Sequence, residues 1–144
     1  MSFLVDTNVL SELRKGRRCD PLVSRWFAGV PDDEVFLSVL VIGEIRRGIE
    51  RIRRRDAQSA RALDGWLRRL LEGHRDRILS VDEAIAEEWG RLNVPDPIPV
   101  VDGLMAATAR VHGLTLATRN VKDVARTGVA CVNPFEPAAG GDPR

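Results

Sequence analysis

Short apolar runs alternate with longer amphipathic segments along most of the chain. The segments between the runs repeat apolar residues every three or four positions, as helices do. Strands that alternate with helices form parallel sheets covered on both faces. The pattern therefore predicts one three-layer α/β domain over residues 1–136, followed by a flexible tail at 137–144 that is rich in Pro, Gly and Ala. The runs expected to be strands cover residues 2–6, 34–38, 78–81, 114–117 and 129–132.

The helical pattern is clearest between residues 57 and 73. An amphipathic stripe there consists of Leu63, Trp66, Leu67, Leu70 and Leu71. We assign this stripe to the core, with a protein-interaction surface as the alternative. The segment Ser80-Val81-Asp82-Glu83 matches a capping box and predicts another helix start. The helix that this box opens would place Ile85, Trp89 and Leu92 inward, and further helices are expected after residue 6 and at 20–29, 39–52, 102–113 and 121–125.

Four acidic residues follow apolar runs or stand near predicted helix starts. They are Asp6, Glu44, Asp102 and Asp123. Open parallel sheets bind ligands at the carboxyl ends of their strands, so residues that are distant in sequence meet there. Carboxylates gathered at one sheet edge are the ligands of hard cations. This arrangement predicts a site for Mg²⁺ or Mn²⁺ rather than zinc, since neither Cys nor His is clustered with the acids.

Each acid also has a simpler explanation when it is taken alone. Asp6 could belong to a turn in which Thr7 or Asn8 caps the next helix, and Asp102 could be a plain N-cap. Glu44 lies off the apolar stripe of its helix, and either Asp123 or Asn120 could cap a helical turn. Together, however, the acids would repel one another. Two unit charges about 4 Å apart cost roughly 4 kcal/mol at an effective dielectric constant near 20, so a cluster favours a cation.

Basic charge is concentrated in one segment of a chain whose net charge is only +1. Between Arg46 and Arg77 there are eleven arginines and five acidic residues. Arginine presents a planar fork of donors that matches phosphate. The segment is therefore either a solvated helix face or a phosphate-binding surface beside the acidic site.

Several classes of protein are excluded by what the sequence lacks. No apolar run approaches the roughly 20 residues that span a bilayer, and no basic stretch precedes the apolar N-terminus, so we expect a cytoplasmic protein with no membrane partner. Cys19 and Cys131 are isolated and are expected to be free thiols. The glycine-rich loops of dinucleotide and NTP sites and the serine-hydrolase elbow are absent.

Four segments of the chain, in order, resemble the motifs of one enzyme family. They are Leu4–Asn8, Ser38–Glu44, Val101–Ala109 and Leu116–Asp123, and Asn133-Pro134-Phe135 resembles the usual ending of the family. This pattern resembles the PIN-domain nucleases, most closely the VapC-type toxins of bacterial toxin–antitoxin pairs. The resemblance implies a PIN-like α/β/α fold with a short central parallel sheet. It also implies a homodimer that a VapB-type antitoxin silences by covering its active-site groove.

The implied activity is that of a Mg²⁺- or Mn²⁺-dependent endoribonuclease that inhibits translation and growth, with transfer RNA among the candidate substrates. Asp6, Glu44 and Asp102 fall on the acidic positions of the family. Some relatives carry aspartate where this chain has Asn120, and others place the fourth acid three residues later, as Asp123 is here.

The resemblance leads to a mechanistic hypothesis. Asp6 and Asp102 would bind the metal directly, while Glu44 and Asp123 would do so directly or through water. A metal-activated water would attack the phosphate and leave a 5′-phosphate and a 3′-hydroxyl. The supporting polar residues would be Asn8, Thr118 and Asn120, and the residues predicted to contact RNA are Arg46, Arg47 and Arg119.

Three other functions remain compatible with the sequence. The protein could be a PIN nuclease that matures RNA, or a catalytically silent module that binds nucleic acid or protein. A phospho-receiver-like domain also collects acids at strand ends, although Lys122 is misplaced for one. The alternative for the leucine stripe of residues 63–71 is then a dimer or antitoxin surface.

Overall fold

A parallel sheet of five strands forms the centre of the molecule, for which a computed structural model describes residues 1–137. The strand order is β3-β2-β1-β4-β5, and every neighbouring pair is parallel. The order reverses beside β1: the chain adds β2 and β3 on one side and β4 and β5 on the other. The crevice at such a reversal is where open α/β sheets bind ligands. The strands are β1 (Phe3–Val5), β2 (Val35–Ser38), β3 (Ile78–Leu79), β4 (Thr115–Ala117) and β5 (Cys131–Val132).

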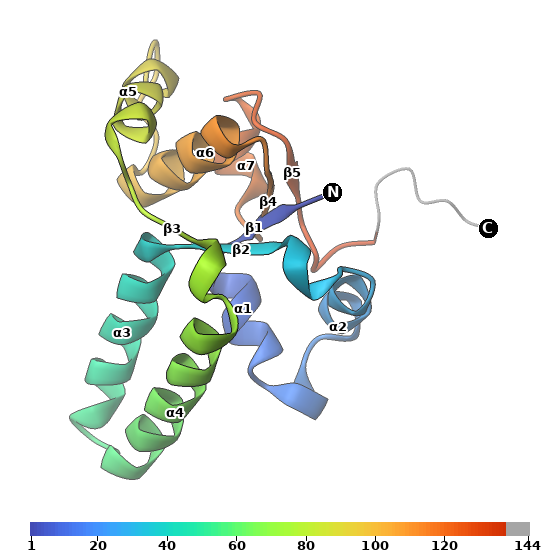
Figure 1. Ribbon diagram of the computed structural model, residues 1–144, viewed down its shortest axis with the longest axis vertical. Coiled ribbons are helices and arrows are strands. Elements are labelled where there is room, and N and C mark those ends of the chain that lie inside the picture. The colour runs from blue at the N-terminus through green and yellow to red at the C-terminus, as the bar shows by residue number, and fades with distance from the viewer. Residues whose placement is uncertain (138–144) are drawn as a thin grey trace.

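Seven α-helices lie on the two faces of this sheet within residues 1–137. Figure 1 shows α3 and α4 as a hairpin that projects from one side, with α5 and α6 together on the other side. This arrangement confirms the predicted three layers. The helices are α1 (Thr7–Leu13), α2 (Pro21–Ala28), α3 (Val39–Arg53), α4 (Ala57–Gly73), α5 (Glu83–Leu92), α6 (Val100–His112) and α7 (Val121–Ala125). Short 3₁₀ turns occupy Gly16–Arg18, Asp32–Glu34 and Arg75–Arg77.

The helix caps differ from the prediction at three places. Asp6, not Thr7 or Asn8, caps α1, and its side chain accepts a hydrogen bond from the Thr7 amide. Asp82, not Ser80, caps α5 by accepting from the Ile85 amide three residues on. Asp102 is not a cap either, because α6 begins two residues earlier. Its carboxylate is therefore available for another purpose.

The core lies on both faces of the sheet and includes the buried strand residues Leu4, Val5, Leu37 and Leu116. The predicted stripe on α4 packs against it, with Leu67 buried and the other four side chains partly buried. Helix α6 contributes an almost continuous buried stretch from Met105 to Ala109. This placement fixes the first turn of α6 above the sheet edge.

Three other expectations concern the cysteines, membrane-spanning helices and the end of the chain. Both cysteines are free thiols, as expected. Among the helices described, none is long and apolar enough to cross a membrane. Apart from Pro137, the predicted tail at 137–144 lies outside the described residues.

Candidate active site

The site is built around Asp6 and Thr118, which leave adjacent strands at the same level. Val5 of β1 is in register with Ala117 of β4, so the next residue of each strand emerges at the carboxyl edge of the sheet. The Thr118 hydroxyl donates to Asp6 Oδ2 over 2.7 Å. Both side chains are nearly inaccessible, with 7% and 1% of their surface exposed. Strand pairing thus joins two residues that are 112 positions apart.

Glu44 reaches the same edge from helix α3. The buried Ser38 ends β2, and its side chain caps α3 by accepting from the Leu40 amide. Glu44 lies in the second turn of that helix, and its Oε1 accepts a hydrogen bond of 2.6 Å from the Thr7 hydroxyl. This bond connects the first turn of α1 to α3. The interpretation of Glu44 as a solvated flank residue is therefore wrong, because Thr7 holds its half-buried carboxylate.

A hollow of about 310 Å³ lies over this edge, and we call it the acidic hollow. It brings together five of the residues predicted to act in catalysis or metal binding, which come from the β1–α1 junction, α1, α3, α6 and the β4–α7 turn. They are Asp6, Asn8, Glu44, Asp102 and Asn120. The remaining lining residues are Thr7, Arg47, Gly48, Arg51 and Val101.

The acids of the acidic hollow disfavour one another's charge. Burial is the largest cause that raises the pKa of Asp6; hydrogen bonds from Thr118 and Thr7 lower this pKa, and the charge of Glu44 raises it. Burial also raises the pKa of Asp102, followed by repulsion from Asp6 and Asp123; the Asn120 side chain lowers this pKa and Glu44 raises it. A bound cation would lower the raised pKa values of these carboxylates, because it offsets their mutual repulsion.

The donor set of the acidic hollow fits a hard divalent cation, since it offers carboxylate and amide oxygens. Among residues 1–137, however, no group of three or more Asp, Glu, His or Cys side chains stands ready to hold a metal ion. The hydrogen bonds explain this. Both Asp6 oxygens are turned toward Thr7 and Thr118, and one Glu44 oxygen is turned toward Thr7. Each of these oxygens keeps a second lone pair, so a cation could bind them while the threonines continue to donate.

Asp123 lies on α7, exposed and outside the lining of the acidic hollow. Its charge nevertheless contributes to the raised pKa of Asp102, which places it near the site. Asn120 lines the hollow itself, and its backbone amide donates to the Thr118 hydroxyl over 3.0 Å. Asn120 and Asp123 are the two candidates for the fourth position of the metal site, and only Asn120 lines the acidic hollow.

The predicted RNA-binding arginines have three different surroundings. Arg47 lines the acidic hollow. Arg46 points elsewhere and pairs with Glu50 at 3.0 Å and Asp64 at 2.7 Å. The Arg119 guanidinium lies 3.6 Å from the centre of the Phe135 ring, and its backbone amide donates to Asn8 Oδ1. A contact between RNA and Arg46 or Arg119 stays a prediction.

Arg51 is the charged lining residue that the sequence analysis missed. It follows Glu44 by seven positions and Arg47 by four, so the three residues share one face of α3. This spacing could have identified Arg51. The predicted pair of Arg46 and Arg47 instead combined two neighbours whose side chains diverge on a helix.

Comparisons with known proteins agree with this geometry. The family described as PIN domain matches residues 3–129. VapC ribonuclease Y4jK from Sinorhizobium fredii is 32% identical over 144 aligned residues, which cover 94% of this chain and 99% of that protein. The crystal structure of FitAcB from Neisseria gonorrhoeae is similar with a TM-score of 0.86 and 29% identity, covering 93% of this chain and 99% of that one. A toxin–antitoxin complex from Klebsiella pneumoniae is similar with a TM-score of 0.72 and 27% identity, covering 94% and 99%.

Proposed function

Because the chain belongs to the PIN domain family, we propose that it is a metal-dependent endoribonuclease and the toxin of a toxin–antitoxin pair. The name of its relative, a VapC ribonuclease, supports the activity. A similar chain in a toxin–antitoxin complex supports the biological role. Both relatives align with nearly the whole chain, so the proposal concerns the complete domain.

One observation carries the proposal: Asp6 and Asp102 face one hollow from separate elements, and each has a raised pKa. Asp6, Asp102 and Glu44 are the residues that would hold Mg²⁺ or Mn²⁺, with Asn120 or Asp123 as the fourth contributor. When bound, such an ion acts as a Lewis acid that favours water as a nucleophile and offsets charge on the phosphate.

The neighbouring polar residues keep the carboxylates in position. Thr118 and the Thr7 amide hold the two oxygens of Asp6, while the Thr7 hydroxyl holds Glu44. Outer partners of this kind set the orientation of metal ligands. Thr7 therefore orients two acids at once, through its amide and its hydroxyl.

Arg47 and Arg51 supply the positive wall of the acidic hollow. Their guanidinium groups can bind the phosphates on either side of the cleaved bond in a bidentate manner. The acids and the arginines then act on the same stretch of backbone. In this proposal the acids hold the metal ion that promotes the reaction, and the two arginines bind the phosphates of the substrate.

The proposed reaction is hydrolysis of one phosphodiester bond. Water adds to the phosphorus, and the bond between phosphorus and the 3′ oxygen breaks. The released 3′ oxygen takes up a proton, which leaves a 5′-phosphate on one fragment and a 3′-hydroxyl on the other. The ribose 2′-hydroxyl is not consumed, so a 2′,3′-cyclic phosphate is not formed.

The remaining parts of the proposal concern the cell. We expect a cytoplasmic homodimer whose cognate VapB-type antitoxin covers the acidic hollow and blocks RNA. Transfer RNA is one candidate substrate, and its cleavage would inhibit translation.

Purified protein free of antitoxin tests the proposal directly. Wild-type protein should cut RNA in Mg²⁺ or Mn²⁺ and stop when EDTA is added, and sequencing of the fragment ends should find 5′-phosphates. Asp102→Asn should reduce cutting to background while its circular dichroism spectrum stays native. Cyclic phosphate ends, or wild-type cutting by the Asp102→Asn protein, would contradict the proposal.

A further inference from the structure

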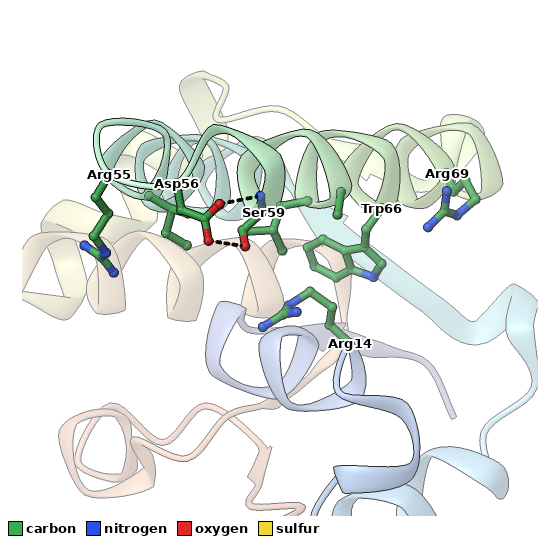
Figure 2. A pocket seen from close by; sticks show the side chains of 9 residues that line it. Arg14, Arg55, Asp56, Ser59, Trp66 and Arg69 are labelled. Atoms are coloured by element: carbon green, nitrogen blue, oxygen red, sulfur yellow. Dashed lines mark hydrogen bonds between the residues drawn. The ribbon is translucent and has the colours of Figure 1, made fainter.

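A second hollow, which we call the arginine hollow, lies between α1 and the α3–α4 hairpin. Its volume is about 540 Å³. Figure 2 shows Trp66 pointing from α4 toward α1, with the Arg14 side chain reaching up toward it. Arg55 and Arg69 stand near opposite ends of the view. The proposed nuclease mechanism uses none of these four side chains.

The arginine hollow is continuous with the acidic hollow. A third hollow of about 270 Å³ lies between them and shares lining residues with both. It shares Thr7, Glu44 and Gly48 with the acidic hollow. It shares Arg14, Ile52, Leu63 and Trp66 with the arginine hollow. The three hollows adjoin one another along α3, and we treat them together as one groove, with three carboxylates lining the acidic hollow and Arg14, Arg55 and Arg69 lining the arginine hollow.

The arginines of the arginine hollow have no ion-pair partner among the described residues; hydrogen bonds from Ser59 and, more weakly, the charge of Arg55 lower the pKa of Asp56. Within residues 1–137, Arg14, Arg55 and Arg69 take part in none of the ion pairs. The one acid in the lining, Asp56, has both oxygens bound to the amide and hydroxyl of Ser59, at 3.0 and 2.6 Å. Three exposed guanidinium groups are therefore available to an anionic ligand.

The hollow also contains an aromatic surface. Trp66 is half-buried and lines both the arginine hollow and the joining hollow, together with the apolar Ile52 and Leu63. An aromatic face beside cations is the combination that binds single-stranded nucleic acid, because every base can stack on it. A base that is paired in a duplex cannot turn into such a hollow.

We propose that this groove holds a single-stranded RNA segment next to the cleaved bond, with one base stacked on Trp66 and backbone phosphates bound by Arg14, Arg55 and Arg69. The assignment rests on the proposed endoribonuclease function and locates a binding subsite for the substrate outside the acidic hollow. Glu44 and Ile52 are eight helical residues apart, about 12 Å, which roughly three nucleotides span.

Binding of a labelled, unstructured RNA of about 12 nucleotides to Asp102→Asn protein, followed by fluorescence anisotropy, tests the proposal without cleavage. Adding Arg69→Gln should weaken affinity about three- to tenfold and reduce the salt slope by about 0.7, the amount for one phosphate on a single strand. The matched control is Arg68→Gln, which removes the same charge from the neighbouring position outside the groove. It should leave both quantities close to those of the parent.

The aromatic contact is tested with Trp66→Leu and Trp66→Phe in the same background. The leucine variant should bind the single strand about five- to a hundredfold more weakly, while the phenylalanine variant keeps most of the affinity. Trp66 also packs against the core, so the melting temperature of each variant is measured beside its affinity. The Arg69 comparison does not depend on that packing.

The outcomes separate this proposal from the nuclease proposal. If Arg69→Gln and Trp66→Leu bind RNA as Arg68→Gln does, the groove assignment is overturned. If the groove variants lose RNA binding but wild-type protein cuts no RNA, the groove assignment stands and the nuclease proposal fails.

Discussion

Two short hydrogen bonds, one local and one from the far end of the chain, hold the carboxylate of Asp6, and the Asn8 side chain adds a longer one at 3.5 Å. The first short bond comes from the Thr7 amide at 2.7 Å and the second from the Thr118 hydroxyl at 2.7 Å. Both lower the pKa of a buried group whose pKa burial raises. The hydrogen bond from Thr118 therefore favours the charged form of Asp6, against the effect of burial, and also fixes the orientation of the carboxylate.

Replacing Thr118 with valine tests this positioning role. Thr118→Val keeps the shape but removes the hydroxyl, so metal-dependent cutting should fall about 10- to 100-fold. The pKa of Asp6 should rise further, which moves the acidic limb of the pH–rate profile to higher pH. Thr108→Val is the matched control, because Thr108 is equally buried and donates only to the Leu104 carbonyl within α6. Equal rates and equal acidic limbs in the two variants would refute the role.

The raised pKa of Asp102 predicts how stability depends on pH. Its folded pKa lies above the ordinary value of 3.8, so the native state holds the proton more tightly than the unfolded state. As pH rises above 3.8 through the folded pKa, the ionised carboxylate therefore destabilises the native protein.

Asp102→Asn should consequently be more stable than wild type at neutral pH in EDTA, and the advantage should disappear below pH 3.8. Urea unfolding across a pH series measures the difference. Asp33→Asn, at an exposed site away from the acidic hollow, controls for the loss of one negative charge. A variant that gains nothing over wild type at neutral pH would show that Asp102 is not under repulsion.

Helices α5 and α6 approach closely where the chain has Gly103. A Cβ atom at this position would lie 3.1 Å from two ring atoms of Trp89 and 3.4 Å from Ile98. Asp102 is the preceding residue on α6. The distance between α5 and α6 therefore sets the position of the Asp102 carboxylate relative to the sheet edge. The Trp89 indole nitrogen is buried without a hydrogen-bond partner among the described residues, so contact alone holds the ring there.

Gly103→Ala should therefore destabilise the protein by about 1–3 kcal/mol and reduce cutting, because α6 must move away from Trp89. Urea unfolding and the cleavage rate measure the two effects. Trp89→Phe in the same chain should restore part of both, since the smaller ring leaves room. Gly90→Ala on α5 meets no atom within 4 Å and should be neutral or stabilising. If Gly103→Ala behaved like Gly90→Ala, close packing would not position Asp102.

The helices could be predicted from sequence more accurately than the strands. The bounds of α4 and α7 agree with the prediction residue for residue, because amphipathic period and capping are local properties. The predicted strand at 78–81 contains only Ile78 and Leu79, which have partners on β2. The apolar run alone does not predict how many of its residues will pair with the neighbouring strand.

In the candidate site too, some features could be predicted from sequence and others depend on how the elements pack. The acids at strand ends could be anticipated, because parallel strands deliver their carboxyl ends to one edge. The bond from Thr7 to Glu44 could not, because it depends on how α1 and α3 lie relative to each other. Arg46 was assigned to RNA because its sequence neighbours are basic, yet its partner Asp64 lies on the next helix.

Metal binding should stabilise the complete domain, because the acids come from β1, α3 and α6. Millimolar Mg²⁺ or Mn²⁺ should raise the melting temperature of the wild-type protein; a concentration ten times the Kd contributes about 1.4 kcal/mol. Asp102→Asn should reduce this shift, as measured by differential scanning fluorimetry. No shift in wild-type protein at saturating metal would count against a shared site.

The bond between Asp6 and Thr118 has a consequence for synthesis of the chain. A ribosome that has made the first hundred residues has produced Asp6 and Glu44, but neither β4 nor Thr118. A nascent or truncated polypeptide lacks the strand beside β1 and cannot complete the catalytic edge. The nuclease can therefore become active only after β4 and Thr118 have left the ribosome.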